Sequence, residues 1–198
     1  MNNQRDFWLK VQTKVQGGDP LAILCVVESI GSSPGRAGFK LGVAYGSEVF
    51  GTIGGGIMEK KLVDLTYDLF DREGSFPYLK RQIHQSDLGQ DRSGMICSGE
   101  QTVAYFFLFG EQAAALVAEI LQAFEGPKGA REIEYSSTGI RIVDTGTRRS
   151  LTEGEWAYYE VLRDRPRIAI VGAGHVSLAL SRQMDLLGFH VIVYDDRK

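Results

Sequence analysis

A chain of 198 residues, 43% hydrophobic and 24% charged, has the composition of a globular protein with one or two domains. Its net charge of −3 gives no electrostatic reason to expect a nucleic acid or an anionic membrane as a partner. The amino-terminal segment has no apolar signal core, no apolar run approaches membrane-spanning length, and two cysteines make no disulfide framework. We therefore expect a cytoplasmic protein.

The sequence of residues 1–162 predicts a mixture of helices and strands without a strict βαβ alternation. Asp6 is placed to cap a first helix, which glycines at 17–18 end. The apolar run Leu21–Val27 is typical of a buried strand. The other predicted elements are a hairpin at 39–53, helices at 57–72 and 111–124, and strands at 78–84, 101–109, 131–135, 140–144 and 155–162. Together they indicate an α+β domain.

Residues 167–198 predict a single Rossmann-like βαβ unit. A strand at 168–171, a glycine turn, a helix and a second strand at 190–194 follow one another. A complete doubly wound sheet needs roughly five or six strands, so this domain is expected to be truncated. We expect it to pack on the preceding domain, to pair with another copy, or to belong to a longer protein. Its open strand edges favour a homodimer.

The glycine turn of this unit is a candidate nucleotide site. Gly172 and Gly174 would let backbone N–H groups approach a phosphate, which His175 could also contact. Asp195 and Asp196 follow about 20 residues later, where a carboxylate can bind a ribose hydroxyl. The alternative is a structural βαβ unit with an empty crevice.

The segment 29–40 is the first candidate site in the amino-terminal domain. It combines small hydroxyls such as Ser33 with flexible glycines, the guanidinium of Arg36 and the ammonium of Lys40. These groups suit an oxyanion such as phosphate, with Arg36 as a bidentate donor and Lys40 as a point charge. The alternative is a surface loop with a solvated arginine.

Three consecutive glycines, Gly54, Gly55 and Gly56, stand between a predicted strand and a predicted helix. They place bare N–H groups at a helix N-terminus, which favours an anion. A tight turn with positive φ is the alternative, although three glycines exceed what a turn requires. Glu59 falls in the first helical turn, where a carboxylate complements the helix dipole; a catalytic role is a lesser alternative.

Cys97 lies in a glycine-rich segment before a strand, where its thiol is expected to be accessible. A thiolate there could ligate a soft metal or carry sulfur, and inert packing is the alternative. No CxxC or Cys/His pair accompanies it, so zinc is not expected. Cys25, inside an apolar strand, is expected to be a core residue.

Four motifs resemble those of the xanthine dehydrogenase accessory protein family, XdhC/CoxI. They are GSSPGRAG at 31–38, GTIGGGIMEKKL at 51–62, MICSGE at 95–100, and IVGAGHVSLAL at 170–180 with VIVYDDR at 191–197. The resemblance implies an XdhC/CoxI domain followed by the start of a Rossmann-like domain. It also implies a chaperone that binds molybdenum cofactor, assists its sulfuration and delivers it to a molybdenum hydroxylase.

The resemblance also suggests a role for each site. The glycines 54–56 and Arg36 would cradle the phosphate of molybdopterin, and Cys97 would sit near the molybdenum. The expected partners are an apo molybdenum hydroxylase and a sulfurtransferase. The sequence shows no nucleophile–base–orienter set, which agrees with a carrier that has no turnover of its own.

Two other functions stay open at this point. An NAD(P)-dependent oxidoreductase would use the glycine turn at 172–174 with Asp195 or Asp196. A non-catalytic interaction module would use the glycine loops only as turns.

Overall fold

The computed structural model describes residues 3–46, 48–70, 77–84, 99–126, 129–163 and 165–196. Its elements are α1 (Gln4–Gln16), β1 (Leu21–Gly31), β2 (Lys40–Ala44), β3 (Val49–Gly51), α2 (Gly56–Phe70), β4 (Tyr78–His84), β5 (Gly99–Leu108), α3 (Gly110–Phe124), β6 (Arg131–Ser136), β7 (Gly139–Asp144), β8 (Ala157–Val161), β9 (Arg167–Val171), α4 (His175–Leu186) and β10 (His190–Tyr194). The predicted mixture of helices and strands is confirmed. None of the helices in these ranges is long and apolar enough to cross a bilayer.

A five-stranded antiparallel sheet forms the centre of the amino-terminal unit, in the order β3-β2-β1-β5-β4. β1 and β5 pair along their whole length, and at one end Gly31 lies opposite Gly99. The register shifts between Val26 and Glu28, and such a bulge bends a strand and increases its twist. The bulge precedes the first glycine-rich loop and therefore helps to set the direction in which that loop leaves the sheet.

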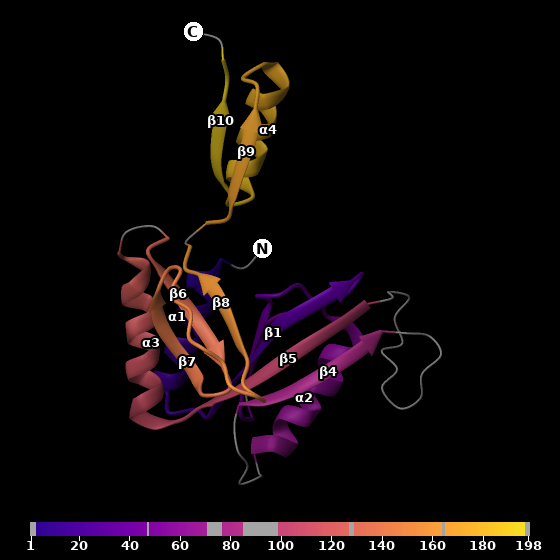
Figure 1. The fold of residues 1–198 in the computed structure, drawn as a ribbon, viewed down its shortest axis with the longest axis vertical. Coiled ribbons are helices and arrows are strands. Elements are labelled where there is room, and N and C mark those ends of the chain that lie inside the picture. Colours follow the sequence, from indigo (N-terminus) through magenta and orange to yellow (C-terminus); the bar gives the residue numbers. More distant parts are fainter. Residues whose placement is uncertain are drawn as a thin grey trace.

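Both faces of this sheet are covered (Figure 1). α2 packs on one face through Leu62 and Leu69. On the other face lie α1, α3 and a three-stranded antiparallel sheet in the order β7-β6-β8. Because both faces are covered, the first six residues of β1 are buried without the alternation of a half-exposed strand. The prediction of a buried strand at this position is therefore confirmed.

The start of α1 differs from the sequence-based expectation. Asn3 has an extended backbone, with φ −61° and ψ 142°, and its side chain accepts a hydrogen bond from the N–H of Arg5. The prediction of Asp6 as the cap was wrong, because Asp6 already lies in the first helical turn. There its charge complements the helix dipole without capping the chain.

The small sheet holds two buried carboxylates on β6. Glu132 and Glu134 are 4% and 1% exposed. Arg148 pairs with Glu132 at 2.6 Å, and Arg141 pairs with Glu134 at 2.8 Å. Burial alone would raise the pKa of Glu134, but the hydrogen bond and charge of Arg141, helped by neighbouring hydroxyls, lower it below its usual range. The small sheet therefore depends on charged pairs as well as on apolar packing.

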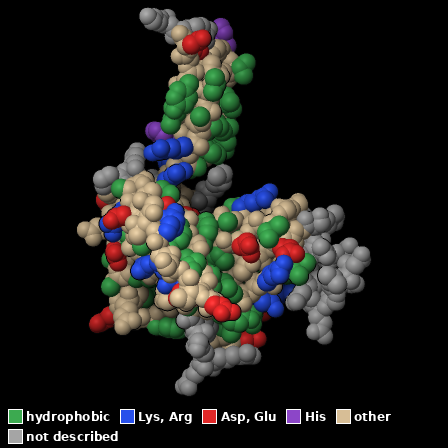
Figure 2. Space-filling view, viewed as in Figure 1, with side chains coloured by type: hydrophobic (Ala, Val, Ile, Leu, Met, Phe, Trp, Pro, Cys, Tyr) green, Lys and Arg blue, Asp and Glu red, His purple; other side chains and the backbone are tan. Residues whose placement is uncertain are grey.

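The carboxyl-terminal unit consists of β9, α4 and β10, and its two strands are parallel. Figure 1 shows it at one end of the molecule, joined to the rest by the segment after β8. None of the residues of α4 is buried. Figure 2 shows apolar side chains on the surface of this unit; the most exposed are Val171, Val176, Leu186 and Leu187.

Candidate functional site

The two glycine-rich segments of the amino-terminal unit meet at one end of the five-stranded sheet. A Cβ atom at Gly35 would lie 2.3 Å from the carbonyl oxygen of Ile53, and one at Gly54 would lie 2.8 Å from the N atom of Gly35. Real Cβ contacts are not that short. Glycine is therefore required at both positions because one loop packs directly on the other. We call residues 31–39, 52–56 and 99–101 the loop cluster.

The start of β5 is the third part of the loop cluster. A Cβ atom at Gly99 would lie 2.6 Å from the N atom of Ser33, so the beginning of β5 touches the first loop. The motif at 95–100 thus ends inside the cluster. Cys97, predicted to bind the cofactor and a metal, lies outside the described residues, and its role stays a prediction.

Gln101 connects all these segments through its side-chain amide. The side chain is 3% exposed, and its oxygen accepts hydrogen bonds from the N–H of Gly35 at 3.1 Å and the hydroxyl of Ser33 at 3.0 Å. Its nitrogen donates to the side-chain oxygen of Gln82 at 2.8 Å and faces the carbonyl of Ile53 at 3.4 Å. Because the backbone N–H of Gly35 can only donate, this contact determines which end of the Gln101 amide is the oxygen.

The sequence analysis did not identify Gln101, although the sequence carries a signal. Gln101, Val103 and Tyr105 alternate along β5 and face the same side of the sheet, where the latter two are core residues. Gln82 lies directly opposite Gln101 on β4. A polar residue at an inward position of an apolar strand needs a partner, and that requirement marks both glutamines.

The carboxylate of Glu59 already binds backbone N–H groups of the glycine turn that was predicted to bind an anion. One of its carboxylate oxygens accepts hydrogen bonds from the N–H groups of Ile53 at 2.9 Å and Gly55 at 3.0 Å. The same oxygen accepts one from the hydroxyl of Thr52 at 2.8 Å. Such a carboxylate acts as an internal anion at the start of α2. The prediction that Glu59 complements the helix start is confirmed.

Other donors in the loop cluster and at the adjoining start of α2 stay open to a ligand. Gly56 and Ile57 begin α2, so their N–H groups have no acceptor inside the helix, and no side chain in the described ranges accepts from them. Gly55 has a φ of +73°, and apart from its chain neighbours no described residue has an atom within 4 Å of a Cβ position there. Arg36 is exposed and donates to the carbonyl of Gly31 at 3.3 Å, which leaves further guanidinium donors. This donor set fits a phosphate group.

Two predicted ligand residues are engaged by other side chains of the protein. Ser33 is buried and directs its hydroxyl to Gln101. Lys40 is 7% exposed, and its ammonium lies 2.6 Å from the carboxylate of Glu160 on β8 and over the ring of Tyr135. Its side chain therefore points to the opposite face of the sheet from Gln101. The ammonium also donates to the carbonyl of Gly38 at 2.8 Å, so Lys40 holds the end of the first loop, and its charge is paired with Glu160 rather than left open for a ligand.

The second predicted site lies at the carboxyl ends of β9 and β10. Gly174 precedes α4, and its position is not supported by a side-chain cap. Apart from the adjoining residues of the chain, no atom of the described residues lies within 4 Å of a Cβ position at Gly172 or Gly174, so a ligand has room to approach the turn. Asp195 accepts a hydrogen bond from the N–H of Ala173. Asp196 is exposed, and both acids line an open pocket with Gly172.

His175 is the first residue of α4 and is exposed beside the glycine turn. It is therefore placed where the sequence predicted it, at the helix N-terminus. Within the described ranges, no group of three or more His, Cys, Asp or Glu side chains is arranged to hold a metal ion. Nucleotide binding by this turn stays a prediction.

Comparison with known proteins supports the resemblance drawn from the motifs. A family model described as the XdhC and CoxI family matches residues 15–79, which include both glycine-rich segments. The uncharacterized protein YqeB of Escherichia coli strain K12 is 24% identical over 176 residues, which cover 89% of this chain and 22% of YqeB. The chain thus matches only about a fifth of that relative.

A solved structure shares the fold at lower sequence identity. It is a crystal structure described as a xanthine dehydrogenase from Bacillus halodurans, 15% identical, with a TM-score of 0.58. The match covers 96% of this chain and 62% of the solved one, so the chain spans under two thirds of its length. Residues 15–79, with both glycine-rich segments, are therefore similar to the XdhC and CoxI family.

Proposed function

We propose that this chain is a cytoplasmic accessory protein of a xanthine dehydrogenase-type molybdenum hydroxylase. In this proposal the loop cluster binds the phosphate of the molybdenum cofactor. The observation that supports it is the packing of Gly35 on Gly54, which joins the exposed Arg36 to the glycine turn at the start of α2. A guanidinium and open backbone N–H groups in one place suit a phosphate monoester.

The residues of the cluster have separate tasks in this proposal. Arg36 binds the phosphate through paired N–H donors, while Gln101 holds the two loops together. Glu59 keeps the turn in shape, and its negative charge opposes a second anion nearby. Such opposition suits a carrier, because a carrier must release its ligand to a client. The cofactor itself would supply the molybdenum chemistry that the client enzyme uses.

The proposed partners follow from this carrier role. An apo hydroxylase would receive the cofactor, and a sulfurtransferase would act on the cofactor before its transfer. The strands β9 and β10 form a two-stranded sheet with open edges, which favours a homodimer. These partners and the dimer are parts of the proposal.

The test measures molybdopterin retained by the protein after purification from a host that synthesises the cofactor. We expect Arg36→Gln to lower the pterin content about tenfold, since a charge-assisted hydrogen-bonded pair is lost. Glu59→Gln removes the competing negative charge and should raise pterin content. The control is Arg182→Gln, an equal charge change on the exposed surface of α4.

Loss of the fold would lower the retained pterin in both variants. A decrease in Arg36→Gln together with an increase in Glu59→Gln therefore indicates an effect on ligand binding. Circular dichroism of each variant checks that the helices and strands are intact. Wild-type protein that holds no pterin under anaerobic handling, beside a positive control that does, would contradict the proposal. Equal losses in Arg36→Gln and Arg182→Gln would also contradict it.

The open glycine turn of the carboxyl-terminal unit favours a second candidate, NAD(P) binding. Gly172 and Gly174 leave room for a phosphate, and Asp196 is exposed at the end of β10. Titration calorimetry with NAD on the wild type and on Asp196→Asn tests this candidate. Saturable binding that weakens in the variant supports a nucleotide site, and no heat of binding in the wild type excludes it.

A further inference from the structure

The segment that joins the two units carries three arginines at alternate positions. Arg163, Arg165 and Arg167 are all exposed, and Pro166 lies between the last two. The chain bends at Arg165, and Arg167 begins β9. Three guanidinium groups therefore belong to a span of five residues at the junction of the two units.

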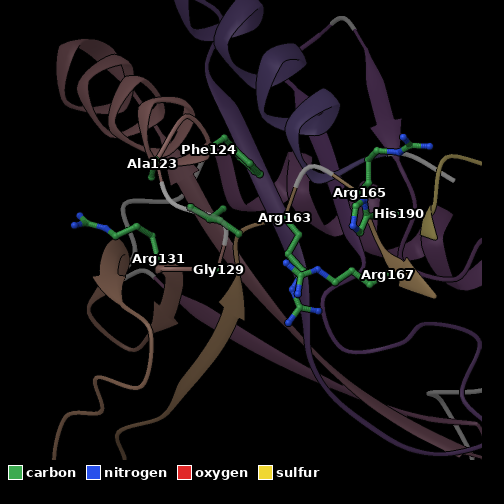
Figure 3. Close-up of a pocket in the computed structure, with 10 residues that line it drawn as sticks. Ala123, Phe124, Gly129, Arg131, Arg163, Arg165, Arg167 and His190 are labelled. Atoms are coloured by element: carbon green, nitrogen blue, oxygen red, sulfur yellow. The ribbon is translucent and has the colours of Figure 1, made fainter. Parts of the chain in front are cut away.

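A small pocket of about 110 Å³ lies at this junction. The described residues that line it include Phe124, Leu162, His190, Arg131, Arg163, Arg165 and Arg167. Among all the described residues that line the pocket, four are arginines and none is an aspartate or glutamate. Figure 3 shows the side chains of Arg163 and Arg167 pointing toward one another. Phe124 and Leu162 are buried and give the pocket an apolar side.

Two of the four arginines are already neutralised. Arg165 forms an ion pair with Asp185 at 2.7 Å, and Arg131 forms one with Asp144 at 3.1 Å. The guanidinium groups of Arg163 and Arg167 have no carboxylate partner within the ranges that the structure describes. Two converging positive charges repel each other, and a shared anion removes that repulsion.

We propose that Arg163 and Arg167, with His190, form an oxyanion site between the two units. The ligand is a phosphate group, either free or on a small molecule. The pocket is smaller than the roughly 300 Å³ at which sites for whole drug-sized ligands begin, so it suits one such group. Guanidinium forks match the oxygens of phosphate, and an apolar wall strengthens the attraction.

This site is separate from both sites described above. Arg167 and His190 are the first residues of β9 and β10, whereas the glycine turn lies at the carboxyl ends of these strands. Arg163 belongs to the end of the amino-terminal unit. A bound phosphate therefore contacts both units and holds them in one arrangement.

The test is titration calorimetry with inorganic phosphate at constant ionic strength. We expect saturable binding to the full chain and a loss of at least tenfold in affinity in Arg163→Gln/Arg167→Gln. Arg182→Gln on α4 carries the same kind of charge change outside the pocket and should leave the affinity within about twofold of wild type. Adenosine monophosphate is titrated in parallel. Tighter binding of the ester than of phosphate identifies a phosphorylated molecule as the ligand, and equal or weaker binding identifies free phosphate.

Three results would overturn the inference. One is a wild type without saturable phosphate binding, and another is an equal loss in Arg182→Gln, which would mean non-specific attraction. The third is loss of phosphate binding in Arg36→Gln with full binding in the double variant. That result would place the phosphate in the loop cluster, so it separates this inference from the proposed function.

Discussion

Replacement of Gln101 by leucine tests the central contact of the loop cluster. The change removes the acceptor of the Gly35 N–H and the donor to the Gln82 carbonyl, and both of these groups are buried. The Ser33 hydroxyl loses its acceptor as well, but a hydroxyl can rotate toward another partner. Each buried group left unpaired costs about 1–3 kcal/mol. Two such groups predict a loss of about 3 kcal/mol in the free energy of unfolding.

Urea unfolding followed by tryptophan fluorescence measures this loss, since Trp8 and Trp156 both lie in the amino-terminal unit. Gln122→Leu is the matched control, because Gln122 is exposed on α3 and its loss should stay within about 0.5 kcal/mol. The double variant Gln82→Leu/Gln101→Leu removes both partners of one bond and should cost less than the sum of the single changes. A Gln101→Leu variant as stable as the control would refute the role assigned to this amide.

Two further predictions concern titratable groups. Burial raises the pKa of the Cys25 thiol to about 12, an effect that the nearby charge of Lys40 only partly opposes, so iodoacetamide at pH 8 should label Cys25 after unfolding and not in the native protein. Peptide mass spectrometry resolves this site, and rapid native labelling would contradict the prediction. Arg141→Gln should lower stability at pH 7 by raising the pKa of Glu134, because the hydrogen bond and charge of Arg141 oppose the effect of burial. Glu134 has a lowered pKa in the fold, so the difference in the free energy of unfolding between wild type and variant should shrink as the pH falls below about 4.5. It should vanish once the carboxyl is protonated. Urea unfolding at several pH values measures this difference, and a constant difference would contradict the assignment.

The helices and strands could be predicted because their sequence patterns are local. The strand at 78–84 was predicted with the bounds of β4, and α3 begins one residue before its predicted start. The pairing of β1 with β5 could not be predicted in the same way. Residues of these strands that face each other, such as Leu21 and Leu108, are far apart in sequence, and no local pattern specifies such a partner.

The candidate site was predicted in part. The resemblance placed Arg36 of the motif at 31–38 and the glycines 54–56 of the motif at 51–62 around one phosphate, and the structure shows that these two loops pack on each other. Lys40 was included because of its charge and its position near the first motif. Its actual partner, Glu160, follows 120 residues later, so the ion pair could not be inferred from spacing. Gln101 was missed because the search followed charged and glycine-rich segments and passed over a neutral polar residue inside a strand.

The tight contacts of Gly35, Gly54 and Gly99 have a consequence for how this sequence can diverge. At each of these positions the added atom of an alanine would lie within 3.0 Å of backbone from another segment, so no L-residue fits without displacing that segment. Gly55 has free space around it and is restricted only by its φ of +73°, which asparagine also tolerates. Homologous chains that keep this arrangement can therefore carry asparagine at position 55. At the other three positions they must keep glycine.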